Sequence, residues 1–366
     1  MPKAVTVLGE IDSKNLKITD MHEHTLADFS NYNQVYKNSF APIDDKFLSI
    51  SQENMYYLRK GYFYLSSDCM HLDSVELLEK EIEFFKNSGG STILDVSPTG
   101  VRGSVKDIAK ISKSTGVNII VSTGLYADKF WPACCQNKSV EQLVSFMKGE
   151  IENGIDGTDI KAGLVKIACN SFNENEQKSL KAGAITAADT GYSFCLHTGG
   201  WTEVYLGIED TKKMLSEVFK QGVKPERVLA CHMDMFIKEC LLSNLIKDRQ
   251  NSSNINLDSL KEILDTGTNI VFDFFGVSAN CESVGFVELS DYERISAILE
   301  LFQAGYSKQI LFGSDVYVKI FYRHFGGNGY TRILDYVVPT LKEYGAKEED
   351  IQNVLVNNPI RLLSVK

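Results

Sequence analysis

The sequence lacks several features that would point to particular classes of protein. No run of roughly 18 uninterrupted apolar residues occurs, so no membrane-spanning helix is expected. Residues 1–15 lack the sustained apolar stretch of a secretory signal. Positive charge is scarce, with 38 Lys and Arg against 48 Asp and Glu, and the net charge is −10. This balance argues against nucleic acid and anionic membranes as partners and leaves a small molecule as the expected ligand.

The eight cysteines show no C-x-x-C spacing. Several lie inside apolar runs, among them Cys169, Cys195 and Cys231. This distribution predicts a reduced, cytoplasmic protein with buried thiols. A glycine-rich phosphate loop is also absent after the first apolar run, which weakens the case for a nucleotide-binding sheet.

Eight short β-branched or apolar runs recur along the chain, separated by amphipathic helical stretches. They are apolar throughout more than they alternate, as expected of strands covered on both faces. The runs are 16–20, 91–96, 118–124, 162–168, 193–198, 227–232, 269–274 and 309–315. Eight strands alternating with helices predict a (β/α)8 TIM barrel of the α/β class, with an open doubly wound sheet as the alternative.

The spacing of the runs is uneven, because residues 21–90 separate the first from the second. Residues 25–75 are therefore predicted to form an elaborated loop region over the barrel mouth. No internal repeat, low-complexity segment or long linker interrupts the chain. We expect one domain over 1–366, opening with a short strand region at about 1–15.

Side chains with metal-binding chemistry follow five of these runs. Active sites of TIM barrels lie at the carboxyl ends of the strands, so these side chains are expected to converge. Four of the six histidines take part, and only His71 and His324 do not. The candidate ligands are His22 and His24 just beyond the first run, Lys166 at the end of the fourth, His197 and His232 at the ends of the fifth and sixth, and Asp315 at the end of the eighth.

The stretch His22-Glu23-His24 is suited to a metal ion. Residues two apart in an extended chain point to the same side, so both imidazoles can reach one ion while Glu23 points away. A polar turn is the alternative for this stretch. Single histidines such as His197 and His232 are more often satisfied buried groups, and an aspartate after a strand can cap a helix. Five strand ends with ligand-type residues favour a shared metal site.

Lys166 places an amine inside the apolar stretch AGLVKIACN, where an unpaired ammonium is costly. Reaction of the amine with CO2 gives an anionic carbamate whose two oxygens can bridge two metal ions. A snorkelling or salt-bridged lysine is the alternative.

Together these residues resemble the phosphotriesterase-like family of the amidohydrolase superfamily. The resemblance also rests on the opening VTVLGEID…ITDMHEH, on TGLY after the third strand, and on IKAGLVKIA around the lysine. It implies a binuclear centre of two divalent ions, with zinc expected and manganese or cobalt as alternatives. On this resemblance, His22, His24 and Asp315 hold the more buried ion, His197 and His232 hold the more exposed one, and N-carboxylated Lys166 and a hydroxide bridge the two.

The implied reaction is a metal-assisted hydrolysis in which Asp315 accepts the proton of the attacking hydroxide. Tyr126, in TGLY, matches a tyrosine near the metals in lactonase-type members, with plain packing as the alternative. The expected substrate is a lactone or ester, including sugar lactones and phosphorylated sugar lactones. The alternatives are an organophosphate triester or an amide on the same site.

Two rival interpretations are weaker. Deaminases and DNA-directed hydrolases of the superfamily share the H-x-H start but generally lack the bridging lysine, here Lys166. A non-enzymatic barrel is least favoured because all six candidate ligands are present. One departure from lactonase-type relatives is Phe274, in FDFFG, where they often carry an arginine.

Selectivity is expected in the loops after the seventh and eighth strands, GVSANCESVGFVELS and VYVKIFYRHFGGNGY. Lys319, Arg323 and His324 in the second loop, and Arg102 elsewhere, are candidates to contact an anionic substrate group. Structural or surface roles are the alternatives. A homodimer is compatible with a barrel of this family.

Overall fold

The computed structural model describes residues 2–365 except for 199–205, 249–253 and 278–283. Its centre is an eight-stranded parallel sheet whose neighbouring strands follow one another in chain order. The strands are β3 (Thr19–Glu23), β6 (Thr92–Asp95), β7 (Asn118–Leu125), β8 (Leu164–Ala168), β9 (Phe194–His197), β10 (Val228–Ala230), β11 (Asn269–Phe272) and β12 (Ile310–Phe312).

The sheet closes between its first and last strands, β3 and β12. The backbone amide of Asp315 donates to the carbonyl oxygen of His22 at 3.0 Å. The Glu23 carboxylate accepts from the backbone amide of Val316 at 2.9 Å. Gly313 permits this close approach, because a Cβ there would lie 2.5 Å from the Cβ of His22. The predicted TIM barrel is confirmed.

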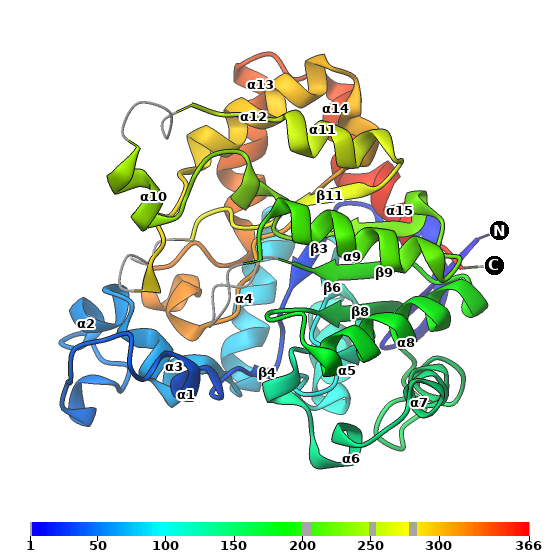
Figure 1. Ribbon diagram of the computed structural model, residues 1–366, viewed down its shortest axis with the longest axis horizontal. Coiled ribbons are helices and arrows are strands. Elements are labelled where there is room, and N and C mark those ends of the chain that lie inside the picture. The colour runs from blue at the N-terminus through cyan, green and yellow to red at the C-terminus, as the bar shows by residue number, and fades with distance from the viewer. Residues whose placement is uncertain (1, 199–205, 249–253, 278–283, 366) are drawn as a thin grey trace.

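Amphipathic helices surround the sheet (Figure 1). The helix α9, for example, buries Thr211, Met214, Leu215 and Val218, the i, i+3, i+4, i+7 spacing of a single apolar face. The main helices are α4 (Val75–Asn87), α5 (Val105–Thr115), α7 (Val140–Glu152), α8 (Glu174–Thr190), α9 (Ile208–Lys220), α11 (Asp258–Asp265), α12 (Asp291–Gln303), α13 (Val338–Glu343), α14 (Glu348–Gln352) and α15 (Asn358–Leu363). Two short helices, α6 (Ala133–Gln136) and α10 (Leu242–Lys247), lie in connecting loops.

The segment after β3 forms the elaborated loop region that the sequence predicts. It contains the helices α1 (Tyr32–Tyr36), α2 (Met55–Arg59) and α3 (Ser67–Met70), coloured blue at the lower left of Figure 1. The antiparallel pair β4 (Ala27–Asp28) and β5 (His71–Leu72) ties its two ends together. This region supplies three of the tyrosines that line the cavity described below.

The N-terminal residues form the hairpin of β1 (Lys3–Thr6) and β2 (Gly9–Asp12). Both chain ends lie side by side (Figure 1), and the backbones of Lys3 and Val365 exchange hydrogen bonds of 3.2 and 2.8 Å. In the described part of the chain, no helix is long and apolar enough to cross a membrane.

The first strand begins later than predicted, at Thr19 rather than at residue 16. Residues 13–16 form a 3-10 helix, capped by the side chain of Asp12. Lys17 has a φ of 54°, which breaks the extended chain before the strand. As a result His22 lies inside β3, and only His24 follows it.

The fourth strand also differs, because Lys166 occupies the middle of β8 and not its end. Its Nζ is fully buried inside the barrel and lies 3.3 Å from the Sγ of Cys231. The thiols of Cys195 and Cys231 are 3.2 Å apart beside it. All the described cysteines are free thiols, and only Cys134 is exposed.

Candidate metal centre

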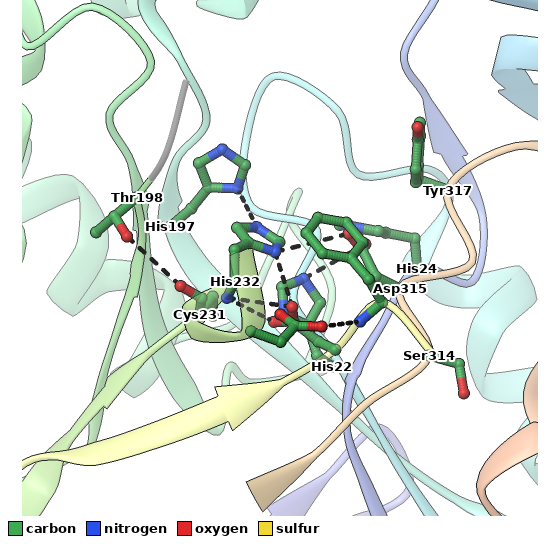
Figure 2. A network of polar contacts seen from close by, with 12 residues as sticks. His22, His24, His197, Thr198, Cys231, His232, Ser314, Asp315 and Tyr317 are labelled. Carbon is green, nitrogen blue, oxygen red and sulfur yellow. Dashed lines mark hydrogen bonds and ion pairs between the residues drawn. The ribbon is translucent and has the colours of Figure 1, made fainter. Parts of the chain in front are cut away.

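The structure brings the four predicted histidines and Asp315 into one cluster at the carboxyl ends of the strands (Figure 2). His24 Nε2 lies 3.1 Å and His22 Nε2 lies 3.5 Å from Asp315 Oδ1. His232 Nδ1 is 3.9 Å from Asp315 Oδ2, and His232 Nε2 is 2.8 Å from His197 Nδ1. The convergence expected at the barrel mouth is therefore present for these five residues.

Two members of the cluster have an unusual backbone. The φ values of His232 and Asp315 are 59° and 48°, in the left-handed region that side-chain-bearing residues rarely adopt. Such strain persists where the surroundings hold it and is concentrated at functional sites. The Glu23 carboxylate helps to hold it, since it accepts from the amides of Ser314 and Val316 on either side of Asp315. This is the structural role expected for Glu23.

Asp273, directly after β11, is the residue that the sequence reasoning missed. Its carboxylate lies 2.6 Å from His22 Nδ1 and 2.9 Å from His232 Nδ1, and the backbone amide of His232 donates to both of its oxygens. At His232 this contact is a hydrogen bond, and a carboxylate only accepts, so Nδ1 of that neutral ring carries the hydrogen and Nε2 keeps its lone pair. His22 Nδ1 lies close to the same carboxylate without a hydrogen bond. A signal was available: Asp273 ends its apolar run in NIVFDF just as Asp315 ends QILFGSD.

The third imidazole is held in the same way, since His24 Nδ1 lies 2.7 Å from the Ser97 hydroxyl. Histidines that bind metals through one nitrogen commonly have the other nitrogen fixed by a carboxylate or hydroxyl. Asp315 Oδ1, the atom toward which two Nε2 atoms point, is buried and accepts no hydrogen bond. The donor set therefore fits a divalent cation bound by histidine nitrogens and an aspartate oxygen, and one such cluster is His22, His24 and Asp315.

The electrostatics of the cluster also favour a bound cation. Burial alone would lower the pKa of His232, but the carboxylates of Asp273 and Asp315 outweigh it and raise that pKa to about 9. Burial, together with the charge of His232, lowers the pKa of His197 well below its usual value. Charge on the neighbouring histidines holds the pKa of Asp273 low despite its burial. Two buried carboxylates are thus compensated by positive charge, which a metal ion can supply in place of protons.

Lys166 is connected to this cluster through Cys231, because its Nζ contacts the Cys231 thiol and Cys231 directly precedes His232 in the chain. Burial disfavours the ammonium form of Lys166, but the neighbouring Cys195, Cys231 and Asp273 outweigh it and hold the pKa of Lys166 above its usual value. Carboxylation of Lys166 is compatible with that position and remains a prediction.

A cavity of about 720 Å³, counted with the open space at its mouth, leads to the cluster. It is lined by His24, Tyr32, Tyr36, Tyr64, Tyr126, Asn170, His197, His232, Phe274, Val277, Val284, Glu288, Asp315 and Tyr317. Tyr126 lies beside the site as expected, with its ring centre 5.6 Å from that of His197 and its hydroxyl 3.0 Å from the Tyr32 hydroxyl.

The four residues considered for an anionic substrate group do not line this cavity. Lys319 Nζ lies 3.1 Å from Asp68 and 2.8 Å from Asp73, and Arg102 is buried against Glu150. Arg323 and His324 are exposed on a 3-10 helix. The predicted selectivity loop after β11 falls partly on residues 278–283, outside the described residues, but its Val277, Val284 and Glu288 line the cavity. The loop after β12 contributes Tyr317.

Comparisons with known proteins agree with this geometry. The model of the phosphotriesterase family matches residues 2–363. The chain is 31% identical over 388 residues to an N-acetyltaurine hydrolase of Dictyostelium discoideum, covering 99% of this chain and 98% of that protein. A resiniferatoxin-binding protein from Rhodobacter sphaeroides superposes with a TM-score of 0.83 at 25% identity, covering 99% of this chain and 94% of that one.

The lactonase Lmo2620 of Listeria monocytogenes has the same fold, with a TM-score of 0.74 at 24% identity over 100% of this chain and 99% of that one. Together, a family match along nearly the whole chain, a barrel of the same architecture and a histidine–aspartate cluster at its mouth lead to one conclusion. The chain belongs to the phosphotriesterase family and is a hydrolase.

Proposed function

We propose that this protein hydrolyses an acyl bond, in a lactone, an ester or an amide, with two divalent metal ions held by the cluster at the barrel mouth. The observation that carries the proposal is the arrangement of the imidazoles around Asp315. His22 and His24 direct Nε2 toward its Oδ1, while their Nδ1 atoms lie against Asp273 and Ser97. Zinc suits this set of nitrogen and oxygen donors.

His22, His24 and Asp315 would hold one ion, and His197 and His232 the other, with carboxylated Lys166 between them. Bound divalent ions lower the pKa of a shared water and polarise a carbonyl oxygen. With the ions bound, Asp315 would accept the proton of the attacking water. The barrel strands hold these groups in place before the substrate arrives, so little reorganisation is needed.

Tyr126 is the second group expected to act on the substrate. Its hydroxyl lies in the cavity and forms a 3.0 Å hydrogen bond with that of Tyr32, which in turn accepts from Asn170 at 3.2 Å. Burial raises the pKa of Tyr126 well above its ordinary value, so the phenol stays protonated. A protonated phenol can donate to the carbonyl oxygen as negative charge develops on it.

An acyl substrate is favoured over a phosphotriester by the relatives. The similar protein of Dictyostelium discoideum is named for cleavage of an amide, and the Listeria protein for cleavage of a lactone. A sugar lactone is one member of this acyl class, and the apolar wall at Phe274 gives no reason to prefer it.

The test is metal content per chain by plasma mass spectrometry on protein purified without added metal, combined with a panel of lactones, esters and amides. About two divalent ions per chain and turnover of at least one acyl substrate are expected. His232→Ala should lower both quantities. The control is His71→Ala, because His71 is half exposed and lies outside the cavity. Unchanged metal content in His232→Ala, or no turnover after zinc, manganese or cobalt is restored, would contradict the proposal.

A further inference from the structure

Among the residues that the structure describes, no lysine or arginine lines the cavity that leads to the candidate metal centre. We infer that it selects uncharged acyl substrates with an apolar or aromatic group, and that it discriminates against substrates carrying a sulfonate or phosphate. The inference rests on the proposed hydrolase function for the identity of the reacting bond. It rests on the lining of the cavity for the class of substrate.

The cavity wall is mainly aromatic. Five tyrosines and Phe274 contribute to it, together with Val277 and Val284. Four of the five tyrosine hydroxyls pair with one another: those of Tyr64 and Tyr317 are 3.1 Å apart, and those of Tyr32 and Tyr126 are 3.0 Å apart. Such pairing leaves ring faces and edges to contact a ligand, and these surfaces stabilise apolar and aromatic groups.

No lysine or arginine lines the cavity in the part of the chain that the structure describes. Apart from the candidate metal ligands, the charged side chain of the described wall is the carboxylate of Glu288. An anion in this space would therefore meet no compensating side-chain cation.

The guanidinium of Arg294, which contacts the lining residue Glu288, is already paired with carboxylates. Arg294 is 2% exposed, and its Nε lies 2.7 Å from Asp234, with Glu288 3.1 Å from its terminal nitrogen. Asp234 also accepts from the backbone amide of Phe274 at 3.2 Å, so this pair supports the strand end from outside the cavity. The charge of Arg294 is thereby balanced within the protein.

Phe274 lines the cavity beside the candidate metal ligands. Its ring stacks on the imidazole of His232, with centres 4.8 Å apart and planes at 18°. A scissile carbonyl must lie at the metal cluster, so the remote end of a substrate falls among the tyrosines, Phe274 and Glu288. A sulfonate or phosphate at that end would lose hydration without an ion pair and would be repelled by Glu288.

Binding can be measured without turnover, using two ketones of matched length on the metal-loaded protein. These are 6,6-dimethylheptan-2-one, which is neutral, and 4-oxopentane-1-sulfonate, which is anionic. We expect the neutral ketone to bind at least about tenfold more tightly in calorimetric titration, because like charge at a site opposes binding of the anion. Equal or tighter binding of the sulfonate would overturn the inference.

The substitution Glu288→Gln tests the origin of the selectivity. It should tighten sulfonate binding about fivefold, the order expected for one partly exposed charge, and leave the neutral ketone unchanged. Glu209→Gln is the matched control, because Glu209 is 71% exposed on α9 and does not line the cavity. No change in the sulfonate affinity of Glu288→Gln would remove Glu288 from the argument and contradict this assignment.

Hydrolysis of the corresponding acetates, 3,3-dimethylbutyl acetate and 2-sulfoethyl acetate, separates this inference from the proposed function. Faster turnover of the neutral ester supports both. Preferential binding of the neutral ketone with no ester turnover would contradict the hydrolytic role but support the selectivity. Faster turnover of the sulfonate ester would support the hydrolytic role and overturn the selectivity.

Discussion

The substitution Asp273→Asn tests how the imidazoles are oriented toward the metals. The Asp273 carboxylate lies 2.6 Å from His22 Nδ1 and 2.9 Å from His232 Nδ1, so one side chain serves two rings. An asparagine side chain has the same shape but offers a single acceptor oxygen and a donor NH2 group. It can therefore face only one of the two Nδ1 atoms with an acceptor, and its NH2 group would lie against the other imidazole, which must rotate or change tautomer.

The size of the effect follows from that geometry. Loss of a group that orients a metal-binding histidine typically costs 10- to 100-fold in metal affinity, or about 1.4–2.7 kcal/mol. One histidine from each proposed ion is disturbed here, because His22 belongs to the first and His232 to the second. We therefore expect Asp273→Asn to weaken zinc binding toward the upper end of that range for at least one ion.

Zinc affinity is measured by competition with a chromophoric chelator at fixed pH, with circular dichroism to confirm folding. The control is Glu176→Gln, because Glu176 is also a buried carboxylate, but it accepts from the backbone amides of Ser171 and Phe172 and does not contact an imidazole. We expect that variant to bind zinc within about threefold of the wild type. Equal zinc affinity in Asp273→Asn and the wild type would refute the orienting role.

Three further predictions concern other parts of the molecule. Lys166→Ala should abolish hydrolysis, with partial recovery on addition of acetate or propionate; full activity without rescue would exclude the carbamate. Arg294→Met should lower the free energy of unfolding in urea by about 3–5 kcal/mol, because it leaves buried carboxylates without their ion-pair partner. Arg332→Met should lower it by at most about 1 kcal/mol, because Arg332 is 27% exposed. Equal losses of unfolding free energy in these two variants would contradict that reasoning. Tyr126→Phe should lower kcat about 10- to 100-fold with little change in KM, and Tyr32→Phe should have a smaller effect. An unchanged kcat in Tyr126→Phe would show that Tyr126 has only a packing role.

Much of the fold was predictable because it depends on local periodicity. Apolar runs covered on both faces and separated by amphipathic helices identify a parallel sheet, and their number identifies the barrel. The first boundary was wrong because the 3-10 helix at 13–16 depends on the Asp12 cap and on the positive φ of Lys17. Such local turns contribute little to the hydrophobic pattern from which the strand was predicted.

The amino-acid sequence alone determined which side chains can bind a metal and that barrel topology would bring them together, because strand ends converge whatever the details of packing. Tertiary structure decided the rest. Only the closure of β12 against β3 sets Asp315 beside His22 and His24, and only the fold shows that Asp273 holds two rings at once. The tyrosine wall likewise combines residues far apart in the chain, and the engagement of nearby cations by buried or exposed carboxylates is a property of packing. Distances between residues that are remote in the chain leave no periodic pattern in a single sequence. The metal-binding chemistry of the centre could therefore be predicted from the sequence, whereas the selectivity of its cavity could not.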